Sequence, residues 1–172
     1  MQRFSKAEEP RLFIRLSRLS VRVDRIVKDG GTVQLGRVVL TAHLTPGHTE
    51  GNTTWTAVVE QNGRKYDVVF AGSMSINPGV HLVNYPPWPN IAELYARSFR
   101  VLERLHCDVF LGPHANFFDM ETKVRQLNAN PNSNPFVDPG GYRHYIASFE
   151  KRYNEQLQSE RGSRNLPQAK LK

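Results

Sequence analysis

The order of the predicted elements indicates an α/β fold in which a mixed β-sheet carries helices on one face. Short β-type runs separated by turn signals follow residue 21. Helical periodicity then dominates, interrupted by one short apolar run that is typical of a buried strand. Because a helix–strand–helix order does not close a barrel, we expect the helices to cover one side of the sheet. The other face of the sheet then needs a further layer of structure to cover it.

The predicted strands are short, and turn residues separate most of them. Gln61-Asn62-Gly63-Arg64 is a hairpin signal between two of these runs. Successive apolar residues in the run before Gly72 predict burial on both faces. The strands are expected at residues 32–35, 37–45, 53–60, 65–71 and 107–112.

Three helices are predicted after the first four strands. The first covers 91–105, with Asn90 as its N-cap and Glu93 at the capping-box position. The second covers about 120–129, with Asp119 as a candidate cap. A final amphipathic helix is indicated by apolar residues at helical spacing. These residues are Tyr142, Tyr145, Ile146, Phe149, Tyr153 and Leu157.

Length and composition indicate one soluble domain with a basic N-terminal segment. The 172 residues correspond to one domain, and the single cysteine excludes an internal disulfide. Residues 1–28 carry eight Lys and Arg against three Asp and Glu, whereas the remaining residues carry fifteen against thirteen. The nearly neutral body gives no reason to expect a nucleic-acid partner, and no apolar run long enough for a membrane span occurs.

The two ends of the chain are expected to lie outside the folded body. Residues 1–20 form a basic leader that is either disordered or a helix suited to an acidic partner, and residues 159–172 form a flexible tail. The leader lacks the apolar core and cleavage site of a secretory signal, which predicts a cytoplasmic location for the chain as written.

Two of the six histidines follow predicted strands in the same way. His48 comes after a β-run and Pro46-Gly47, and His114 comes after a β-run and Pro113. Side chains at strand ends on one sheet edge are often assembled into sites, and imidazoles there can bind zinc. The alternative is that each is an ordinary loop histidine. His43 is expected to pack within its strand, and His106 and His144 are expected to face solvent.

A third strand end carries hydroxyl groups. Ser73 and Ser75 follow the predicted strand 65–71, where they either hold a water or a substrate carboxylate, or cap a turn. No Gly-x-Ser-x-Gly elbow, phosphate-binding loop or dinucleotide fingerprint surrounds them.

Four motifs in one order resemble the C-terminal half of a metallo-β-lactamase, and more narrowly the third subclass of the class B enzymes. The resemblance covers about residues 21–158, which form the predicted partial domain. It implies an αββα sandwich of which this chain supplies about one sheet-plus-helices half. The motifs are HLTPGHTEGNTTW, FAGSMSINPG, CDVFLGPHANFF and NPFVDPGGYRHYI.

The resemblance also implies a zinc-dependent hydrolysis of β-lactam antibiotics. His48 is then a ligand of one zinc and His114 a ligand of the other. Ser73 lies near the metal-bound water, and Ser75 and Asn77 meet the substrate carboxylate. The family is periplasmic or secreted. A glyoxalase II-like thioester hydrolase is the nearest alternative, although such relatives carry an aspartate where this chain has Ser73.

Departures from the family pattern predict that the isolated chain is inactive. The motif His-x-His-x-Asp-His is absent from this sequence, which leaves one histidine for each zinc. A catalytic zinc commonly has three protein ligands. Cys107 is expected to be a buried, unpaired thiol. A non-catalytic reading therefore stays open, in which the uncovered sheet face drives self-association or the basic leader binds an acidic partner.

Overall fold

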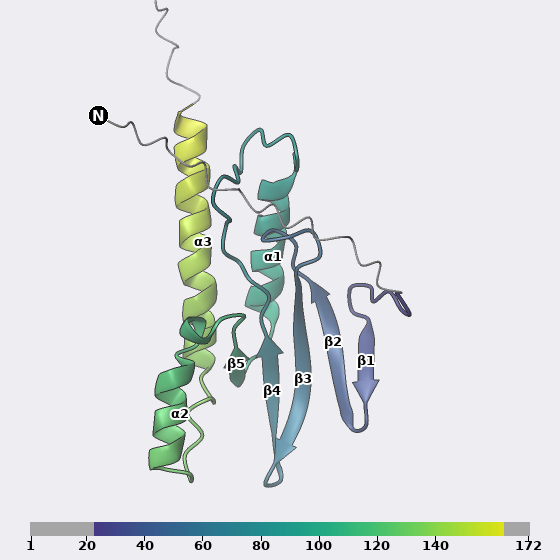
Figure 1. Cartoon of the computed structure of the whole chain (residues 1–172), viewed down its shortest axis with the longest axis vertical. Helices are drawn as coiled ribbons and strands as arrows, with labels where there is room; N and C mark the ends of the chain where they lie inside the picture. Colours follow the sequence, from purple (N-terminus) through teal and green to yellow (C-terminus); the bar gives the residue numbers. More distant parts are fainter. Residues whose placement is uncertain (1–22, 164–172) are drawn as a thin grey trace, which may run out of the picture.

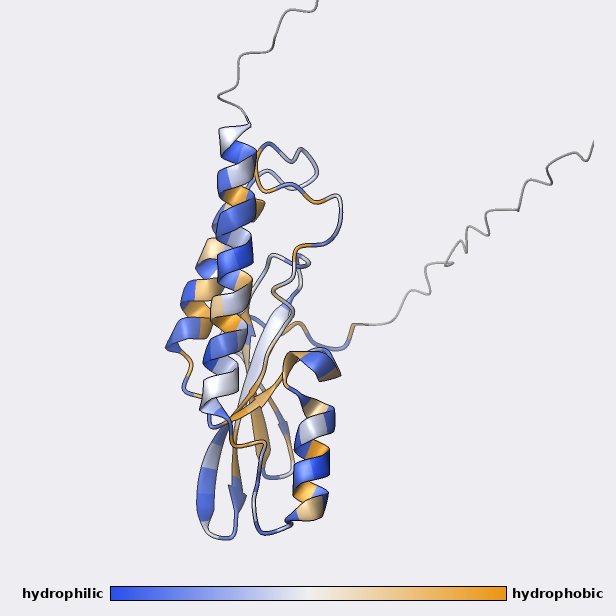
Figure 2. Cartoon of the chain, turned by 90° about the vertical axis from the view of Figure 1, so that its left-hand side faces the viewer, coloured by the Kyte–Doolittle hydropathy of each residue, from blue (hydrophilic) through white to orange (hydrophobic). Residues whose placement is uncertain are grey.

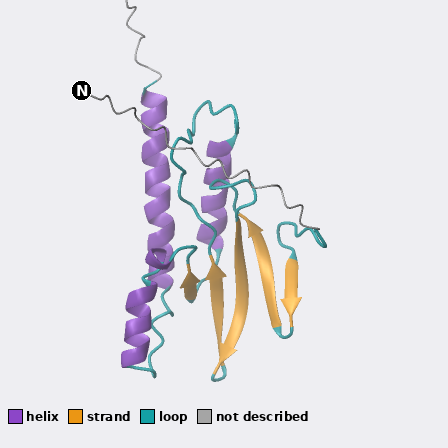
Figure 3. Ribbon diagram, in the orientation of Figure 1, coloured by secondary structure: helices purple, strands orange, loops and turns teal. Residues whose placement is uncertain are grey.

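The computed structural model describes residues 23–163, so the predicted leader and most of the predicted tail lie outside the described residues. Figure 3 shows a five-stranded sheet with three α-helices. The predicted elements are confirmed, with a short 3-10 helix added in the loop after β5. In chain order they are β1 (Thr32–Leu35), β2 (Val38–Leu44), β3 (Thr53–Gln61), β4 (Arg64–Phe70), α1 (Ile91–Arg104), β5 (Val109–Leu111), η1 (Ala115–Phe117), α2 (Met120–Ala129) and α3 (Pro139–Gly162).

The sheet is mixed, as the sequence predicts. Its strand order is β1-β2-β3-β4-β5, with antiparallel pairs from β1 to β4 and a parallel β4–β5 pair. The parallel pair requires a crossover, which α1 supplies. Strands β2, β4 and β5 therefore run in the same direction and end at one edge of the sheet (Figure 1).

The β3–β4 hairpin is fixed by its two central residues. Asn62 and Gly63 have φ angles of 53° and 75°. Both positions of a type I′ turn need positive φ, and Asn-Gly meets this requirement at low cost. The register that follows pairs Gln61 with Arg64 and Trp55 with Phe70.

Helices α1 and α3 cover one face of the sheet. Val69 of β4 and Phe110 of β5 are fully buried against these helices. Their burial excludes apolar surface from water, which is the main stabilising term of such a core. The large aromatic and aliphatic side chains of this core are Tyr95, Phe99 and Leu102 of α1 and Tyr142, Tyr145, Ile146, Phe149 and Tyr153 of α3.

The opposite face of the sheet exposes apolar side chains. Successive strand residues alternate between faces, so Phe70 points away from the helix side where Val69 lies. Phe70 is 40% exposed, Val59 is 36% exposed and Leu35 is 86% exposed. Figure 1 shows α1 behind the strands, and Figure 2 shows apolar residues on both the strands and the helices. The prediction that strand 65–71 is buried on both faces is therefore wrong at Phe70.

The helix ends correct two capping predictions. Asn90 and Asp119 occupy the N-cap positions of α1 and α2, but neither side chain makes a capping hydrogen bond. Asp119 instead adopts a left-handed backbone with φ of 52°. The side chain of Asp138 caps α3 by accepting a 2.7 Å bond from the Gly141 N–H. Helix α3 continues to Gly162, so residues 159–162 of the predicted tail are helical.

Candidate functional site

The predicted site residues follow β2, β4 and β5 at one sheet edge. His48 lies four residues beyond the end of β2, Ser73 three residues beyond β4, and His114 three residues beyond β5. Because these strands are parallel in direction, their carboxyl ends converge. The structure therefore places all the predicted site residues in loops at the same edge (Figure 1).

The imidazole of His48 is held by the loop that follows β4. Its Nδ1 lies 2.8 Å from the carbonyl oxygen of Ser75 and 3.2 Å from the Ser75 hydroxyl. A carbonyl oxygen accepts hydrogen bonds and never donates them, so Nδ1 carries the proton. In the neutral ring, Nε2 then keeps its lone pair. This tautomer and orientation are the ones a histidine needs to bind a metal through Nε2.

The Pro46-Gly47 corner is built so that the chain passes close to α1. Gly47 has φ of 152°, and a Cβ placed there would lie 2.7 Å from Cδ1 of Tyr95. The buried Ser98 hydroxyl donates a 2.7 Å bond to the Pro46 carbonyl. Glycine is therefore required for this close approach, and α1 fixes the corner that presents His48.

The predicted substrate-binding residues are brought into contact with His48. The Ser73 and Ser75 hydroxyls lie 2.9 Å apart. The Asn77 amide donates a 3.2 Å bond to the backbone carbonyl of His48. Ser73 is buried, Ser75 is half-buried and Asn77 is exposed. Three of the predicted residues thus form one polar cluster around His48.

Asn52 and two threonines join the loops that carry this cluster, and sequence reasoning missed them. The Asn52 amide donates to the carbonyls of Thr45, at 2.6 Å, and Ser73, at 3.0 Å. The fully buried Thr54 hydroxyl lies 3.1 Å from that of Thr45 and accepts a 3.0 Å bond from the Gly72 N–H. The only sequence signal was their place in the stretch of residues 45–54 that surrounds His48.

Two buried tyrosines support the Ser73–Ser75 loop from below. The Tyr95 hydroxyl donates a 2.8 Å bond to the Ser75 carbonyl, which also accepts from His48. The Tyr145 hydroxyl donates to the Gly72 carbonyl at 2.9 Å and accepts from the Met74 N–H at 3.2 Å. Burial raises the pKa of both phenols well above their usual range, so both remain protonated donors.

His114 is at the same sheet edge but contacts none of these residues. Its side chain is exposed, and its ring meets Phe117 edge-on with centroids 5.1 Å apart. Its backbone carbonyl accepts the first bond of η1, from the Phe117 N–H at 3.0 Å. The ring nitrogens of His114 have no hydrogen-bond partner among residues 23–163, which leaves both accessible from solvent.

The other histidines have separate environments. His43 packs in its strand as predicted, with Nε2 2.9 Å from the Thr56 hydroxyl. His81 Nδ1 lies 3.6 Å from Glu160 Oε1, and His144 Nε2 lies 3.2 Å from the Ser148 hydroxyl. His106 is exposed, as expected, but it also lies in a group of acidic side chains that the sequence did not reveal.

Within the described part of the chain, that group is the one set of three or more potential metal ligands close together. It consists of Asp67, His106 and Asp108. Asp108 precedes β5 whereas His114 follows it, so the group lies toward the opposite end of that strand. It is therefore distinct from the cluster around His48.

The residues around His48 fit a zinc site in part. A free Nε2 with Nδ1 bonded to a carbonyl is the donor arrangement that zinc-binding histidines use. A catalytic zinc takes about three protein ligands, however, and no group of three or more histidine, cysteine or carboxylate ligands in residues 23–163 includes His48. The described chain thus supplies one correctly oriented imidazole rather than a full ligand set.

The fold and the strand-end histidine together define half of a metallo-β-lactamase-type domain, and known structures agree. Native FEZ-1 metallo-β-lactamase from Legionella gormanii is 45% identical, with a TM-score of 0.79 over 82% of this chain and 53% of that chain. BJP-1, a subclass B3 metallo-β-lactamase of Bradyrhizobium japonicum, is 34% identical, with a TM-score of 0.75 over 83% and 53%. A Cronobacter sakazakii metallo-β-lactamase with a HARLDQ motif is 33% identical, with a TM-score of 0.75 over 82% and 52%.

This chain is accordingly a partial metallo-β-lactamase fold of the subclass B3 type. It spans about half the length of the solved structures that it matches. No protein-family model matches the sequence. A search of the described residues finds no helix that is both long and apolar enough to cross a membrane.

Proposed function

We propose that this chain carries one half of a zinc-dependent β-lactam-hydrolysing site. The observation that carries the proposal is the fixed tautomer of His48, whose Nδ1 is bonded to the Ser75 carbonyl at 2.8 Å. His48 and His114 are the proposed zinc ligands, one for each ion of a two-zinc site. Zinc in such sites activates water and stabilises the negative charge that develops as the lactam amide breaks.

The polar residues beside His48 are proposed to receive the substrate. The Ser75 hydroxyl lies beside the imidazole of His48, and the Asn77 amide is bonded to the backbone carbonyl of that residue. Both groups can donate hydrogen bonds, so they suit the carboxylate of a β-lactam. Ser73 is bonded to Ser75 and buried, which suits it to hold the Ser75 hydroxyl in place and to lie near the metal-bound water.

The chain alone is proposed to be inactive, because the site lacks most of its ligands. The family motif His-x-His-x-Asp-His does not occur in this sequence. One imidazole for each ion holds zinc too weakly to keep a catalytic water in position.

A chimera tests this proposal more sharply than the isolated chain. Residues 23–163 would be fused behind the part of the Legionella gormanii enzyme that they do not cover. We expect the chimera to hydrolyse nitrocefin in a zinc-dependent way. His48→Ala should lower this activity by at least about a hundredfold, as for other groups required by the chemistry. The matched control His144→Ala should leave the activity unchanged. The isolated chain with excess zinc should show no turnover.

Two outcomes would overturn the proposal. One is a folded, zinc-loaded chimera whose activity is the same in His48→Ala as in its parent. The other is enzyme-like nitrocefin turnover by the isolated chain that a chelator abolishes. A thioester substrate in the same panel separates the alternative hydrolase: activity on the thioester but not on nitrocefin would favour the glyoxalase II-like reading.

The exposed sheet face supports a second candidate function, which is self-association without catalysis. Leu35, Val59 and Phe70 expose apolar surface on the face opposite the helices, and such a patch commonly marks an interface. Sedimentation at increasing concentration tests it. A concentration-dependent dimer that Phe70→Lys weakens would support association, and a monomer at every concentration with no binding of a hydrophobic dye would refute it.

A further inference from the structure

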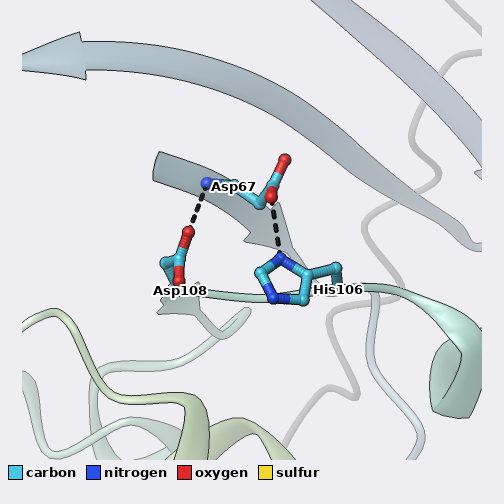
Figure 4. A group of neighbouring side chains, drawn as sticks. All are labelled: Asp67, His106 and Asp108. Atoms are coloured by element: carbon cyan, nitrogen blue, oxygen red, sulfur yellow. Dashed lines mark hydrogen bonds and ion pairs between the residues drawn. The ribbon is translucent and has the colours of Figure 1, made fainter. Parts of the chain in front are cut away.

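The side chains of Asp67, His106 and Asp108 form a compact group between β4, the end of α1 and the start of β5 (Figure 4). Each offers one ligand atom, and these atoms all lie within 4.8 Å of one another. Asp67 lies in the middle of β4, and Asp108 is beside it because Val68 pairs with Val109. Three rigid segments therefore hold the group together.

The hydrogen bonds within the group leave one possible metal-ligand atom of each side chain without a partner among the described residues. His106 Nδ1 is 2.7 Å from Asp67 Oδ2, and Asp108 Oδ2 accepts a 2.9 Å bond from the Asp67 backbone N–H. No other described residue bonds to Asp67 Oδ1, to Asp108 Oδ1 or to His106 Nε2. Each residue can therefore offer an atom to an ion while the hydrogen bonds that position the three side chains are kept.

The two carboxylates of the group have one ion-pair partner between them among residues 23–163. Asp67 has His106 as its only ion-pair partner among residues 23–163, and Asp108 has none. A divalent cation would offset the repulsion between the two carboxylates.

Solvent reaches the group from two sides. His106 and Asp67 line a surface hollow over the helix-facing side of β2 and β3. His106 and Asp108 line a second hollow between the end of α1 and the start of α3. The side chain of His106 is 76% exposed and that of Asp67 is 45% exposed. Both side chains therefore have room to rotate and bring their ligand atoms around one ion.

We propose that Asp67, His106 and Asp108 form a second divalent-metal site, distinct from the strand-end site, and that it takes zinc. One imidazole nitrogen and two carboxylate oxygens suit zinc, which accepts three protein ligands and a water. Zinc–ligand distances of about 2.0–2.2 Å put neighbouring donors about 3.4 Å apart. The ligand atoms of the group lie within 4.8 Å of one another, and His106 Nδ1 and Asp67 Oδ2 are 2.7 Å apart, so zinc binding requires these side chains to rotate. The bound ion would tie α1 to β4 and β5. The proposal does not rest on the function proposed for His48.

Zinc titration of the metal-free full chain by calorimetry tests the proposal. We expect His106→Ala and Asp67→Asn to lose one zinc equivalent, because each removes a ligand from an exposed position without unfolding the chain. His48→Ala, which alters the other site, and the exposed control His144→Ala should keep this equivalent. Zinc should also raise the unfolding temperature of the wild-type chain and of His48→Ala, but not of His106→Ala.

Three results would overturn the proposal. The first is a wild-type chain that binds no zinc in this titration. The second is a His106→Ala variant that keeps the wild-type affinity and stoichiometry, or a loss of the zinc equivalent in His48→Ala instead. Equal losses in His106→Ala and His144→Ala would likewise mean that surface histidines chelate zinc without a defined site.

Discussion

Replacing Tyr145 with phenylalanine removes a single hydroxyl group from beneath the Ser73–Ser75 loop. That hydroxyl donates to the Gly72 carbonyl at 2.9 Å and accepts from the Met74 N–H at 3.2 Å. Met74 is 1% exposed, so water cannot replace the bond to its N–H. A buried polar group left unpaired costs about 1–3 kcal/mol, and the half-buried Gly72 carbonyl adds less, so we expect a loss of about 2 kcal/mol.

Urea denaturation followed by circular dichroism measures this loss. With a slope of about 1–3 kcal/mol per molar urea, 2 kcal/mol lowers the midpoint by roughly 1 M. Tyr66→Phe is the matched control, because the Tyr66 ring contacts Arg64 and its hydroxyl has no hydrogen-bond partner among the described residues. Equal midpoints for the two variants would refute the claim that Tyr145 supports the loop through its hydroxyl.

Three further changes have defined outcomes. Gly47→Ala should lower the free energy of unfolding by about 1–3 kcal/mol, because its Cβ would lie 2.7 Å from Tyr95 Cδ1. Burial alone would raise the pKa of Asp138, but the Lys123 ammonium and a backbone N–H lower it. The free energy of unfolding should therefore fall as the pH drops below about 3.9, the ordinary pKa of an aspartate. This fall should be smaller in Lys123→Met. Burial raises the pKa of Cys107 to about 12, so a thiol reagent at neutral pH should react slowly with the native chain and fully after unfolding.

Each of these three predictions has its own control variant or contradicting result. Gly51→Ala adds a Cβ with no atom within 4 Å, and a loss equal to that of Gly47→Ala would remove the steric argument. Lys151→Met breaks an exposed pair with Glu155, and it should leave the acid dependence unchanged. Immediate labelling of Cys107 in the native chain would contradict its burial at 5% exposure.

The acid prediction follows from the sign of the Asp138 shift. A carboxyl group whose pKa is lower in the folded chain stabilises the fold above its unfolded pKa. That contribution disappears as pH falls through the folded pKa. Lys123 is almost fully buried and lies 2.8 Å from Asp138, so its removal takes away a main cause of the lowered pKa. An acid dependence that is identical in Lys123→Met and the wild-type chain would contradict this assignment.

The strands and helices follow from local patterns, and so does the place of His48. Alternation in β2 and β3, the Asn62-Gly63 turn and the period of α1 are all local signals, which the chain carries without tertiary information. The Pro46-Gly47 corner directly after a strand also marked His48 correctly as a strand-end histidine. Its partner in the structure, the Ser75 carbonyl, carries no side-chain signal and was not predictable.

The features that sequence reasoning missed depend on contacts between distant segments. Asp67 and His106 are 39 residues apart, and only the parallel pairing of β4 with β5 brings them together. The Tyr145 hydroxyl reaches Gly72 across 73 residues. Helix periodicity predicted that Tyr145 is buried, but it does not identify the carbonyl that accepts its bond. Propensity placed Asn90 and Asp119 correctly at the N-cap positions, but it did not predict their backbone angles, which depart from the extended conformation of a capping residue and leave both side chains without a capping bond.

The tautomer of His48 is the most direct test of the half-site proposal. Long-range proton–nitrogen correlation spectra of the isotopically labelled chain resolve Nδ1 and Nε2 of each histidine and can be followed during zinc addition. We expect His48 in the Nδ1–H form, with its Nε2 resonance shifting as zinc is added. An Nε2–H tautomer, or a His48 ring that a saturating excess of zinc leaves unchanged, would contradict the role of His48 as a zinc ligand.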